Sequence, residues 1–282
     1  MIEIKDFTFQ YEGEDKPVLK NINMTIENGD FLGIIGHSGA GKSTLTYAIN
    51  GIIPHYYKGD YYGSVKVDGN DTIETSLTDI SKLIGSICQD IDSQMVASVV
   101  EDELLYGLEN FGIPKDEIEE RICSALVEVG ISALRKRNIN SLSGGQKQKV
   151  AIAAIIALKP KTLLLDEPTG ELDPQSSRQV FMLLKNLSEK YGITVIIVEQ
   201  KIMLLCEFAK HIAVLEHGEI IIHDTVDKVL EKSEILEKSG VNCPRVVSLS
   251  NLLMKQGLTE AKICRNVDEA DSMVRMLISQ KG

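Results

Sequence analysis

Short apolar blocks in the first two hundred positions predict strands, and longer stretches with helical spacing lie between them. The run 31–35 is apolar and has the length of a buried strand, as do the runs 162–165 and 193–198. A further short strand is predicted at 84–88. Strands that alternate with helices in this way indicate an α/β fold with a mostly parallel sheet.

The beginning of the chain has a different pattern, with strict alternation. The apolar positions within 2–4 and those within 7–11 alternate in opposite phase, which predicts two half-buried strand pieces joined by a turn or bulge near Asp6. Asn28-Gly29 is a hairpin signal that leads into the strand 31–35. An antiparallel layer is therefore expected before the parallel sheet.

Tyrosines follow this layer in two places. From its spacing alone, Tyr11 is better interpreted as a ring of the core than as a stacking platform for adenine. The segment 54–63 holds four more tyrosines and is interpreted as a half-exposed connection, with a ligand surface as the alternative.

Helical spacing dominates two later regions. From 99 to 158 one helix face carries Ile118, Ile122, Ala125, Leu126 and Val129. Beyond about Glu231 no strand pattern occurs, and one helical stripe carries Ala270, Met273, Val274, Leu277 and Ile278. We therefore expect a domain over 1–230 with an inserted helical subdomain at about 95–158, and a C-terminal helical extension over 231–282, packed on the core or on a partner.

Composition excludes several classes of protein. The 282 residues carry a net charge of −11, which argues against nucleic acid held on a generally basic surface. The longest apolar run, Val150 to Leu158, is far shorter than the ~20 residues that span a bilayer. The N-terminus, 1–6, is charged and strand-like, so no signal peptide is expected. Five scattered cysteines without a C-x-x-C pair favour reduced thiols over disulfides or a zinc site.

The stretch Gly36–Ser43 is the strongest functional signal in the sequence. It matches the P-loop pattern G-x-x-x-x-G-K-[ST], which binds nucleotide phosphates, and it lies between a predicted strand and a predicted helix. Small residues let backbone N–H groups curl around an anion, and the helix N-terminus adds partial positive charge. Lys42 is expected at the β- and γ-phosphates, and the Ser43 hydroxyl at Mg²⁺. The residues expected around the phosphates of ATP are Gly36, His37, Ser38, Gly39, Ala40, Gly41, Lys42, Ser43 and Thr44.

Polar side chains stand where the later buried strands end. Asp166 and Glu167 follow the strand 162–165, and Gln89 follows the strand 84–88. The carboxyl ends of parallel strands are where ligands bind in such folds. Asp166 suits a ligand of Mg²⁺ or its water, and Glu167 suits a general base. The alternative is a pair of solvated turn acids, and Gln89 alone is a weak signal.

A second glycine segment, Leu142–Gln148, contains Ser143-Gly144-Gly145. It resembles an anion-binding nest at a helix start. Taken alone, a helix N-cap followed by a flexible turn is the better interpretation. Further on, Leu172-Asp173-Pro174 is expected to start a helix.

These motifs together resemble the ATP-binding-cassette (ABC) ATPases over about residues 1–230, because they occur in one order and spacing: Gly36–Ser43, Gln89, Leu142–Gln146, Leu165–Glu167 and Leu172-Asp173. Leu-Ser-Gly-Gly-Gln separates cassettes from other P-loop proteins. Further stretches look like the ATPase components of energy-coupling-factor importers of the cobalt, nickel and vitamin type: Gly51–Pro54, Gln89–Gln94, Val100–Glu103, Gly107–Asn110 and Gly145–Gln148.

The resemblance implies a P-loop NTPase cassette that pairs head to tail with a second cassette, identical or not. ATP would be held between one P-loop and the other subunit's signature loop, Ser143, Gly144, Gly145 and Gln146. By this analogy Tyr11 stacks on adenine, which reverses the preference from spacing. Ser43, Gln89 and Asp166 would hold Mg²⁺ and its waters, and Glu167 would polarise the attacking water. Asp173 would lie in the loop that crosses between subunits.

The partners implied are a membrane coupling subunit and a substrate-binding membrane subunit, with no nucleic acid. The chain would work as a peripheral protein on the cytoplasmic face of the membrane. A separate membrane protein selects the solute in this family, so the sequence does not identify it. Two other functions remain: a non-transport cytosolic assembly scaffold, and a regulatory cassette with little hydrolysis.

One position departs from the family pattern. Cassettes normally carry a γ-phosphate-contacting histidine after the last core strand, where this chain has Gln200. An amide can donate an N–H but cannot become cationic or relay a proton. Either hydrolysis at this chain's own P-loop is slow and a partner cassette carries more turnover, or Gln200 is a tolerated substitution with near-normal rates.

Overall fold

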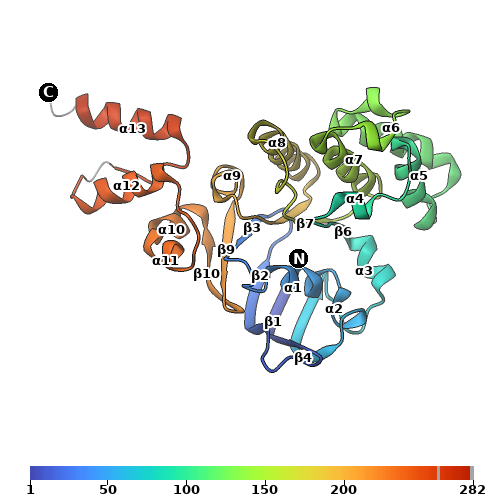
Figure 1. Ribbon diagram of the computed structural model, residues 1–282, viewed down its shortest axis with the longest axis horizontal. Coiled ribbons are helices and arrows are strands. Elements are labelled where there is room, and N and C mark those ends of the chain that lie inside the picture. The colour runs from blue at the N-terminus through green and yellow to red at the C-terminus, as the bar shows by residue number, and fades with distance from the viewer. Residues whose placement is uncertain (259–260, 280–282) are drawn as a thin grey trace.

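The computed structural model describes residues 1–258 and 261–279, and two β-sheets form its centre (Figure 1). The first sheet is antiparallel, in the order β2 (Leu19–Ile26), β1 (Ile2–Tyr11), β4 (Gly59–Val67) and β5 (Asn70–Asp71). The second has the order β10 (Glu219–Thr225), β9 (His211–Glu216), β3 (Phe31–Ile35), β8 (Thr194–Val198), β7 (Thr162–Asp166) and β6 (Ile84–Ile87). Its strands are parallel except β10, which forms a hairpin with β9 through a turn at His217-Gly218.

The predicted bulge near Asp6 is confirmed. Strand β1 is continuous, but Asp6 has φ 48° and the pairing register shifts between Ile4 and Phe7. The extra residue reverses the phase, so that Ile4 and Phe7 are both buried. Gly63 of β4 lies opposite with φ +80°, where a Cβ would come within 2.4 Å of the Asp6 carbonyl oxygen, so this position requires glycine.

The hairpin predicted at Asn28-Gly29 is wrong. A turn forms there, but β2 pairs with β1 in the first sheet, whereas β3 lies between β8 and β9 in the second. Strand β3 is buried along its whole length and needs neighbours and cover on both faces. That requirement decides its position, and the local turn does not.

The tyrosine-rich segment is only partly a connection. Strand β4 begins at Gly59, so Tyr61 and Tyr62 belong to a strand that pairs with β1, and Tyr61 lies opposite Phe9. The spacing of apolar residues does not reveal this strand, because its partner is about fifty positions away. Tyr56 and Tyr57 remain in the exposed connection before β4.

Two cores cover the two faces of the second sheet. Leu32 and Ile34 of β3 join the core shared with the first sheet and with α1 (Lys42–Ile49). Phe31 and Ile35 point to the other core, which contains residues of α8 (Pro174–Tyr191) and α9 (Ile202–Phe208). The short helix α2 (Ile52–His55) lies between α1 and β4, and the short helix α3 (Leu77–Leu83) lies between β5 and β6.

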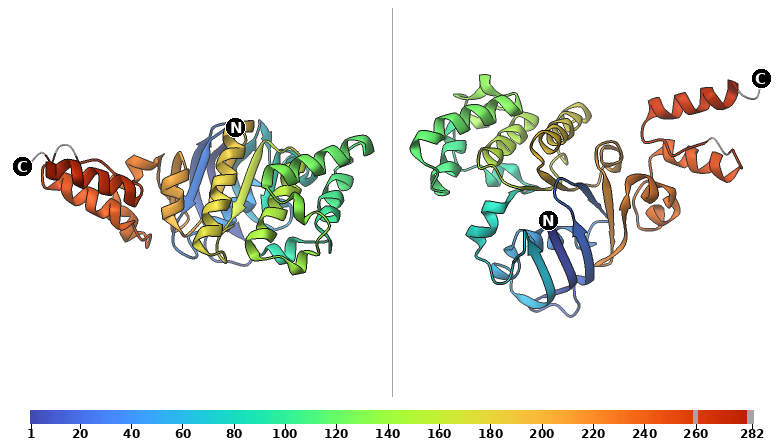
Figure 2. Two further views of the ribbon diagram at one scale, coloured as in Figure 1. Left: turned by 90° about the horizontal axis from the view of Figure 1, so that it is seen from above. Right: turned by 180° about the vertical axis from the view of Figure 1, so that it is seen from behind.

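The predicted helical region lies at one end of the molecule (Figures 1 and 2). It consists of α4 (Ile91–Gln94), α5 (Val100–Asn110), α6 (Lys115–Val129), the 3-10 turns η1 (Ser132–Leu134) and η2 (Ile139–Ser141), and α7 (Gly144–Ala157). All five residues of the stripe predicted on α6 are buried, which confirms that prediction.

The C-terminal helices lie at the opposite end, and the chain terminates on that side (Figure 2). They are α10 (Val226–Glu231), α11 (Ser233–Lys238), α12 (Arg245–Lys255) and α13 (Val267–Ser279). Ala270 and Met273 of the predicted stripe are buried, whereas Ile278 is 67% exposed. Leu236 belongs to the main core, and the domain division near residue 230 stays a prediction. Among the described helices, none has the length and apolarity that a membrane crossing requires.

Candidate nucleotide site

The glycine loop 36–41 joins β3 to α1, as the sequence predicts. Gly36 passes so close to β9 that a Cβ would lie 2.2 Å from the carbonyl oxygen of Leu215. Gly41 has φ +104°, and a Cβ there would lie 3.1 Å from the Val18 carbonyl oxygen. Both glycines are thus required by close backbone packing, and this packing holds the loop in its curled form.

Lys42 bridges the loop that it follows. Its Nζ donates to the carbonyl oxygens of Gly36 at 2.9 Å and His37 at 3.0 Å. Burial lowers the pKa of Lys42, and the negative charges of Glu167 and Asp166 oppose that shift. The ammonium group therefore lies between the loop carbonyls and two carboxylates, in the position where a phosphate would meet a full positive charge.

Three polar side chains converge where neighbouring parallel strands end. Gln89 follows β6, Glu167 follows β7 and Gln200 follows β8. Nε2 of Gln89 donates to Oε2 of Glu167 at 3.1 Å, and Nε2 of Gln200 donates to Oε1 of Glu167 at 2.7 Å. The backbone of Glu167 has φ 47°, an uncommon conformation outside glycine. The Glu167 carboxylate is thus held on both oxygens.

Asp166 lies beside this cluster and is more enclosed. Burial raises the pKa of Asp166, and the charge of Glu167 adds to the rise. The Ser43 hydroxyl and the Lys42 charge act in the opposite direction. Holding the charged form of Asp166 in this buried place therefore costs free energy, and a bound cation would offset that cost.

A cavity of about 250 Å³ lies next to α1 at this sheet edge. Ser43, Gln89 and Asp166 line it together with Tyr47 and Cys88. A hydroxyl, an amide and a carboxylate are oxygen donors, the ligands that Mg²⁺ prefers. The residues present therefore fit a magnesium ion bound next to the phosphates.

Tyr11 lies at the side of this region. Its hydroxyl is 3.1 Å from Oγ1 of Thr44, and its ring makes edge contacts with Phe9 at 4.9 Å and Tyr57 at 5.8 Å between centroids. The side chain is half-buried against the core shared by the two sheets. Burial is also the main cause that raises its pKa. Adenine stacking by Tyr11 stays a prediction.

The signature loop lies at a different place, at the start of α7. Ser143 is the N-cap, and its N–H bonds to Oε1 of Gln146 at 3.0 Å while its hydroxyl accepts from the Gln146 N–H. The predicted N-cap is confirmed, but the helix begins at Gly144, so the flexible turn expected after it is wrong. A Cβ on Gly145 would lie 3.2 Å from the side chain of Ser176.

Asp173 is the N-cap of α8 and accepts the N–H groups of Gln175 and Ser176, each at 3.0 Å. The predicted helix start is therefore confirmed. A hydrogen bond from the Ser176 side chain is the main cause that lowers the pKa of Asp173, and the two N–H groups add to this shift. Because Gly145 packs against Ser176, the signature loop and the Asp173 loop form one surface.

Comparison with known protein families shows which family this chain belongs to. The family described as ABC transporter matches residues 19–170, more than half of the chain. The chain belongs to the ABC transporter family. It is an ATP-binding ABC ATPase, as its motifs predict.

Two relatives match this ABC ATPase over nearly its full length. A putative ABC transporter ATP-binding protein of Pyrococcus horikoshii is 40% identical over 277 residues, 98% of this chain and 96% of that protein. The energy-coupling factor transporter ATP-binding protein EcfA1 of Caldanaerobacter subterraneus subsp. tengcongensis is 40% identical over 262 residues, 92% of each. The resemblance to energy-coupling-factor ATPase components is thereby confirmed.

Solved structures agree. That of cbiO1 from Clostridium perfringens, described as part of the ABC transporter complex cbiONQ, has a TM-score of 0.76 and 31% identity, and covers 88% of this chain and 97% of that one. A dimeric ATP-binding cassette in a post-hydrolysis state with ADP and Pi has a TM-score of 0.69 and 28% identity, and covers 80% of this chain and 99% of that one.

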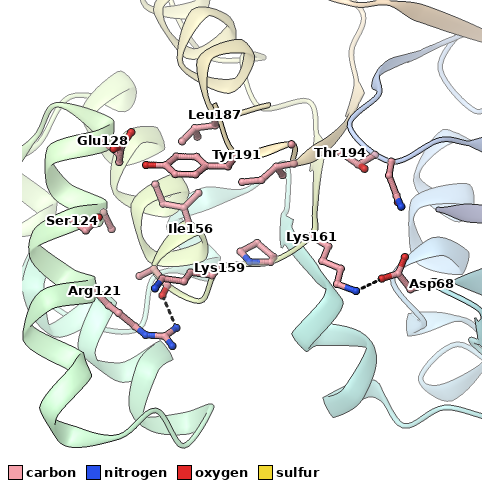
Figure 3. A pocket seen from close by; sticks show the side chains of 16 residues that line it. Asp68, Arg121, Ser124, Glu128, Ile156, Lys159, Lys161, Leu187, Tyr191 and Thr194 are labelled. Atoms are coloured by element: carbon pink, nitrogen blue, oxygen red, sulfur yellow. Dashed lines mark hydrogen bonds and ion pairs between the residues drawn. The ribbon is translucent and has the colours of Figure 1, made fainter. Parts of the chain in front are cut away.

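A larger cavity of this ABC ATPase, about 740 Å³, lies between α6, α7 and α8 (Figure 3). Lys161 and Thr194, which line it, stand at the amino ends of β7 and β8. The P-loop follows the carboxyl end of the parallel strand β3, so this cavity is at the opposite edge of the sheet. Two of the cations that line it, Arg121 and Lys161, form ion pairs with Glu117 and Asp68.

Sequence reasoning missed three residues that lie next to Gln200 in the structure: Thr169, Glu199 and Lys201. Glu199 is 1% exposed and Thr169 is fully buried, and they hydrogen-bond to each other. The available signal was an acid directly after the apolar run 193–198, the same pattern that identified Asp166 after β7.

Proposed function

We propose that this chain is the ATP-hydrolysing subunit of an energy-coupling-factor importer for a micronutrient, either a metal ion or a vitamin. It would work on the cytoplasmic face of the membrane with a second cassette, a membrane coupling subunit and a substrate-binding membrane subunit. The observation that carries the hydrolytic part is the Glu167 carboxylate, held by Gln89 and Gln200 close to Lys42. The similarity to EcfA1 and to cbiO1 supports the type of importer.

In this proposal the loop 36–43 binds the phosphates of ATP through its backbone N–H groups, and Lys42 turns from the loop carbonyls to the β- and γ-phosphates. Tyr11 and Thr44 complete the nucleotide contacts. Ser43, Gln89 and Asp166 would hold Mg²⁺, which supplies charge neutralisation at the phosphates when bound. Glu167 accepts the proton of the water that attacks the γ-phosphorus.

A second cassette completes the site. The signature loop Ser143–Gln146 packs against the Asp173 loop and begins a helix of 14 residues, whose N-terminus carries partial positive charge. We propose that this loop meets the nucleotide on the P-loop of the partner cassette, with Asp173 at the crossing. The similar dimeric cassette with ADP and Pi supports such pairing. Closing and reopening of the pair would move the membrane subunits as rigid bodies.

Gln200 favours a second candidate, a cassette that binds ATP and pairs but hydrolyses slowly at its own P-loop. Its amide occupies Oε1 of Glu167 at 2.7 Å and cannot take up a proton. The base is therefore tied to a neutral donor, and a partner cassette with a histidine would carry more of the turnover. If hydrolysis at this P-loop is very slow, the chain would act as a regulatory cassette, whose role is to bind ATP and pair.

Co-purification tests the proposal. The tagged chain is expressed with the products of its neighbouring genes, extracted in detergent, and its partners are identified by mass spectrometry while ATPase activity is measured. Membrane subunits together with ATPase activity support the importer. A protein that stays entirely in the soluble fraction, without membrane partners, overturns it in favour of a cytosolic assembly ATPase.

A further inference from the structure

We propose that Glu199 is a positioning residue that sets the place of Gln200 against Glu167 and links both to the loop that carries Asp173. The inference rests on the catalytic role proposed for Glu167. Glu199 follows β8 directly, is 1% exposed, and reaches a segment thirty positions earlier in the chain.

The Glu199 carboxylate accepts hydrogen bonds from two directions. Oε1 accepts from the N–H of Thr169 at 3.0 Å and from its hydroxyl. Oε2 accepts from the N–H of Gln200 at 3.2 Å, with the N–H of Lys201 at 3.5 Å. One buried side chain thereby fixes the backbone on which the Gln200 amide stands.

Lys201 also joins the segment after β8 to the loop that carries Asp173. Its Nζ donates to the carbonyl oxygen of Thr169 at 2.7 Å and to that of Leu172 at 3.3 Å. The N–H, hydroxyl and carbonyl groups of Thr169 are thus all bonded to the segment 199–201. Because Leu172 precedes Asp173, the segment after β8 and the Asp173 loop are joined as one unit.

The chemistry of this position requires a carboxylate. A buried charge is costly unless hydrogen-bond donors surround it, and here the hydrogen-bond partners of the Glu199 carboxylate are all donors. A glutamine of the same shape would direct its own N–H₂ group at one set of these donors. The Glu199→Gln variant therefore breaks one half of the link with little change in volume.

The link gives the Asp173 loop a direct route to the catalytic base. A shift of that loop on pairing with another cassette would move Thr169, then Glu199, then the Gln200 amide that lies 2.7 Å from Glu167. Glu199 would thus make hydrolysis sensitive to pairing, while ATP binding at the loop 36–43 would not depend on it.

Kinetics with a double-mutant cycle test the positioning role in the complex of the full chain with its partners. Glu199→Gln is expected to lower kcat about 10-fold and to leave the Kd for ATP unchanged. Thr169→Val, which removes only the hydroxyl, should act in the same direction and more weakly. In the Gln200→Ala background Glu199→Gln should cause no further loss of kcat. An equal loss in both backgrounds overturns the proposal.

The matched control is Asp30→Asn. Asp30 is 7% exposed and accepts the N–H of Phe31 at 2.8 Å, but it lies at the far end of β3. This variant loses a comparable buried carboxylate and should leave kcat unchanged. A fall in kcat as large as that of Glu199→Gln would assign the effect to general destabilisation and overturn positioning.

Hydrogen exchange gives a readout that needs no turnover. In the chain without nucleotide, Glu199→Gln should speed amide exchange of the peptide around Thr169 about 10-fold and leave the peptide around Gly41 unchanged. Unchanged exchange at Thr169 overturns the link. If the wild-type complex hydrolyses no ATP, the proposed function fails, whereas the exchange result still decides whether Glu199 joins the two segments.

Discussion

The amide of Gln200 lies 2.7 Å from the carboxylate of Glu167 and donates to it across 33 positions of sequence. Gln89 donates to the other carboxylate oxygen at 3.1 Å. Both side chains that donate to the Glu167 carboxylate are neutral amides. Of the two, Gln200 stands where cassettes normally carry a histidine after the last core strand. The first prediction concerns this position.

Gln200→His should raise kcat of the purified ATPase complex about 10-fold, because imidazole can become cationic and relay a proton while the amide cannot. Steady-state ATPase assays at saturating ATP measure the change. The control is Gln256→His, an exposed position in the C-terminal extension. If Gln200→His leaves kcat unchanged, Gln200 is a tolerated substitution and the slow-site hypothesis is wrong.

Lys42→Ala should lower ATP affinity by at least about 10-fold and abolish ATP-dependent pairing, because it removes the only ammonium group of the loop motif. Isothermal titration and size-exclusion chromatography measure the two effects. Lys210→Ala is the matched control, since its Nζ also donates to a backbone carbonyl, that of Gly29 at 2.9 Å, away from the loop. Undiminished binding by Lys42→Ala would contradict the nucleotide site itself.

Asp166→Asn should separate stability from metal binding. Burial raises the pKa of Asp166, so the folded chain holds this proton more tightly than the unfolded chain does. The contribution of Asp166 to the free energy of unfolding therefore falls as pH rises from the ordinary aspartate range through the raised pKa. The amide removes this penalty and should give the nucleotide-free chain an equal or higher Tm at neutral pH.

The same variant should lose the extra Tm that Mg²⁺ adds in the presence of ATP, because a carboxylate ligand is gone. Thermal melts from about pH 4 to about pH 8, with and without Mg²⁺, measure both effects. A Tm well below wild type at neutral pH, or an intact response to Mg²⁺, would contradict the assignment of Asp166.

Two helical glycines should respond oppositely to alanine. A Cβ on Gly107 of α5 would have no heavy atom within 4 Å apart from its chain neighbours and the backbone of its own helix. Gly107→Ala should therefore stabilise the fold by about 0.5–1 kcal/mol through helix propensity. Gly145→Ala places its Cβ 3.2 Å from Ser176, so it should lack this gain and weaken ATP-dependent pairing. Denaturant unfolding and size-exclusion chromatography compare them. Equal stabilisation without loss of pairing would show that α7 and α8 need no close approach.

Local pattern was sufficient for the features that depend on neighbours in sequence. The phase reversal at Asp6 is visible in the alternation of apolar residues, and it is a bulge in β1. Asp166 and Glu167 stand at a strand end because an apolar run stops there. The loop 36–43 is recognisable because its glycines, lysine and serine occur at one spacing. These features involve few residues close in the chain, and each is encoded by residue type.

The tertiary structure alone decided which segments meet. In the structure β2 and β3 belong to different sheets, although a turn at Asn28-Gly29 joins them. Part of the tyrosine-rich segment forms β4, which pairs with β1. The tertiary structure also joins Glu199 to Thr169 in a buried link. The physical reason is the same in all three cases: burial and hydrogen-bond satisfaction depend on partners distant in sequence, and no local pattern specifies which partner that is.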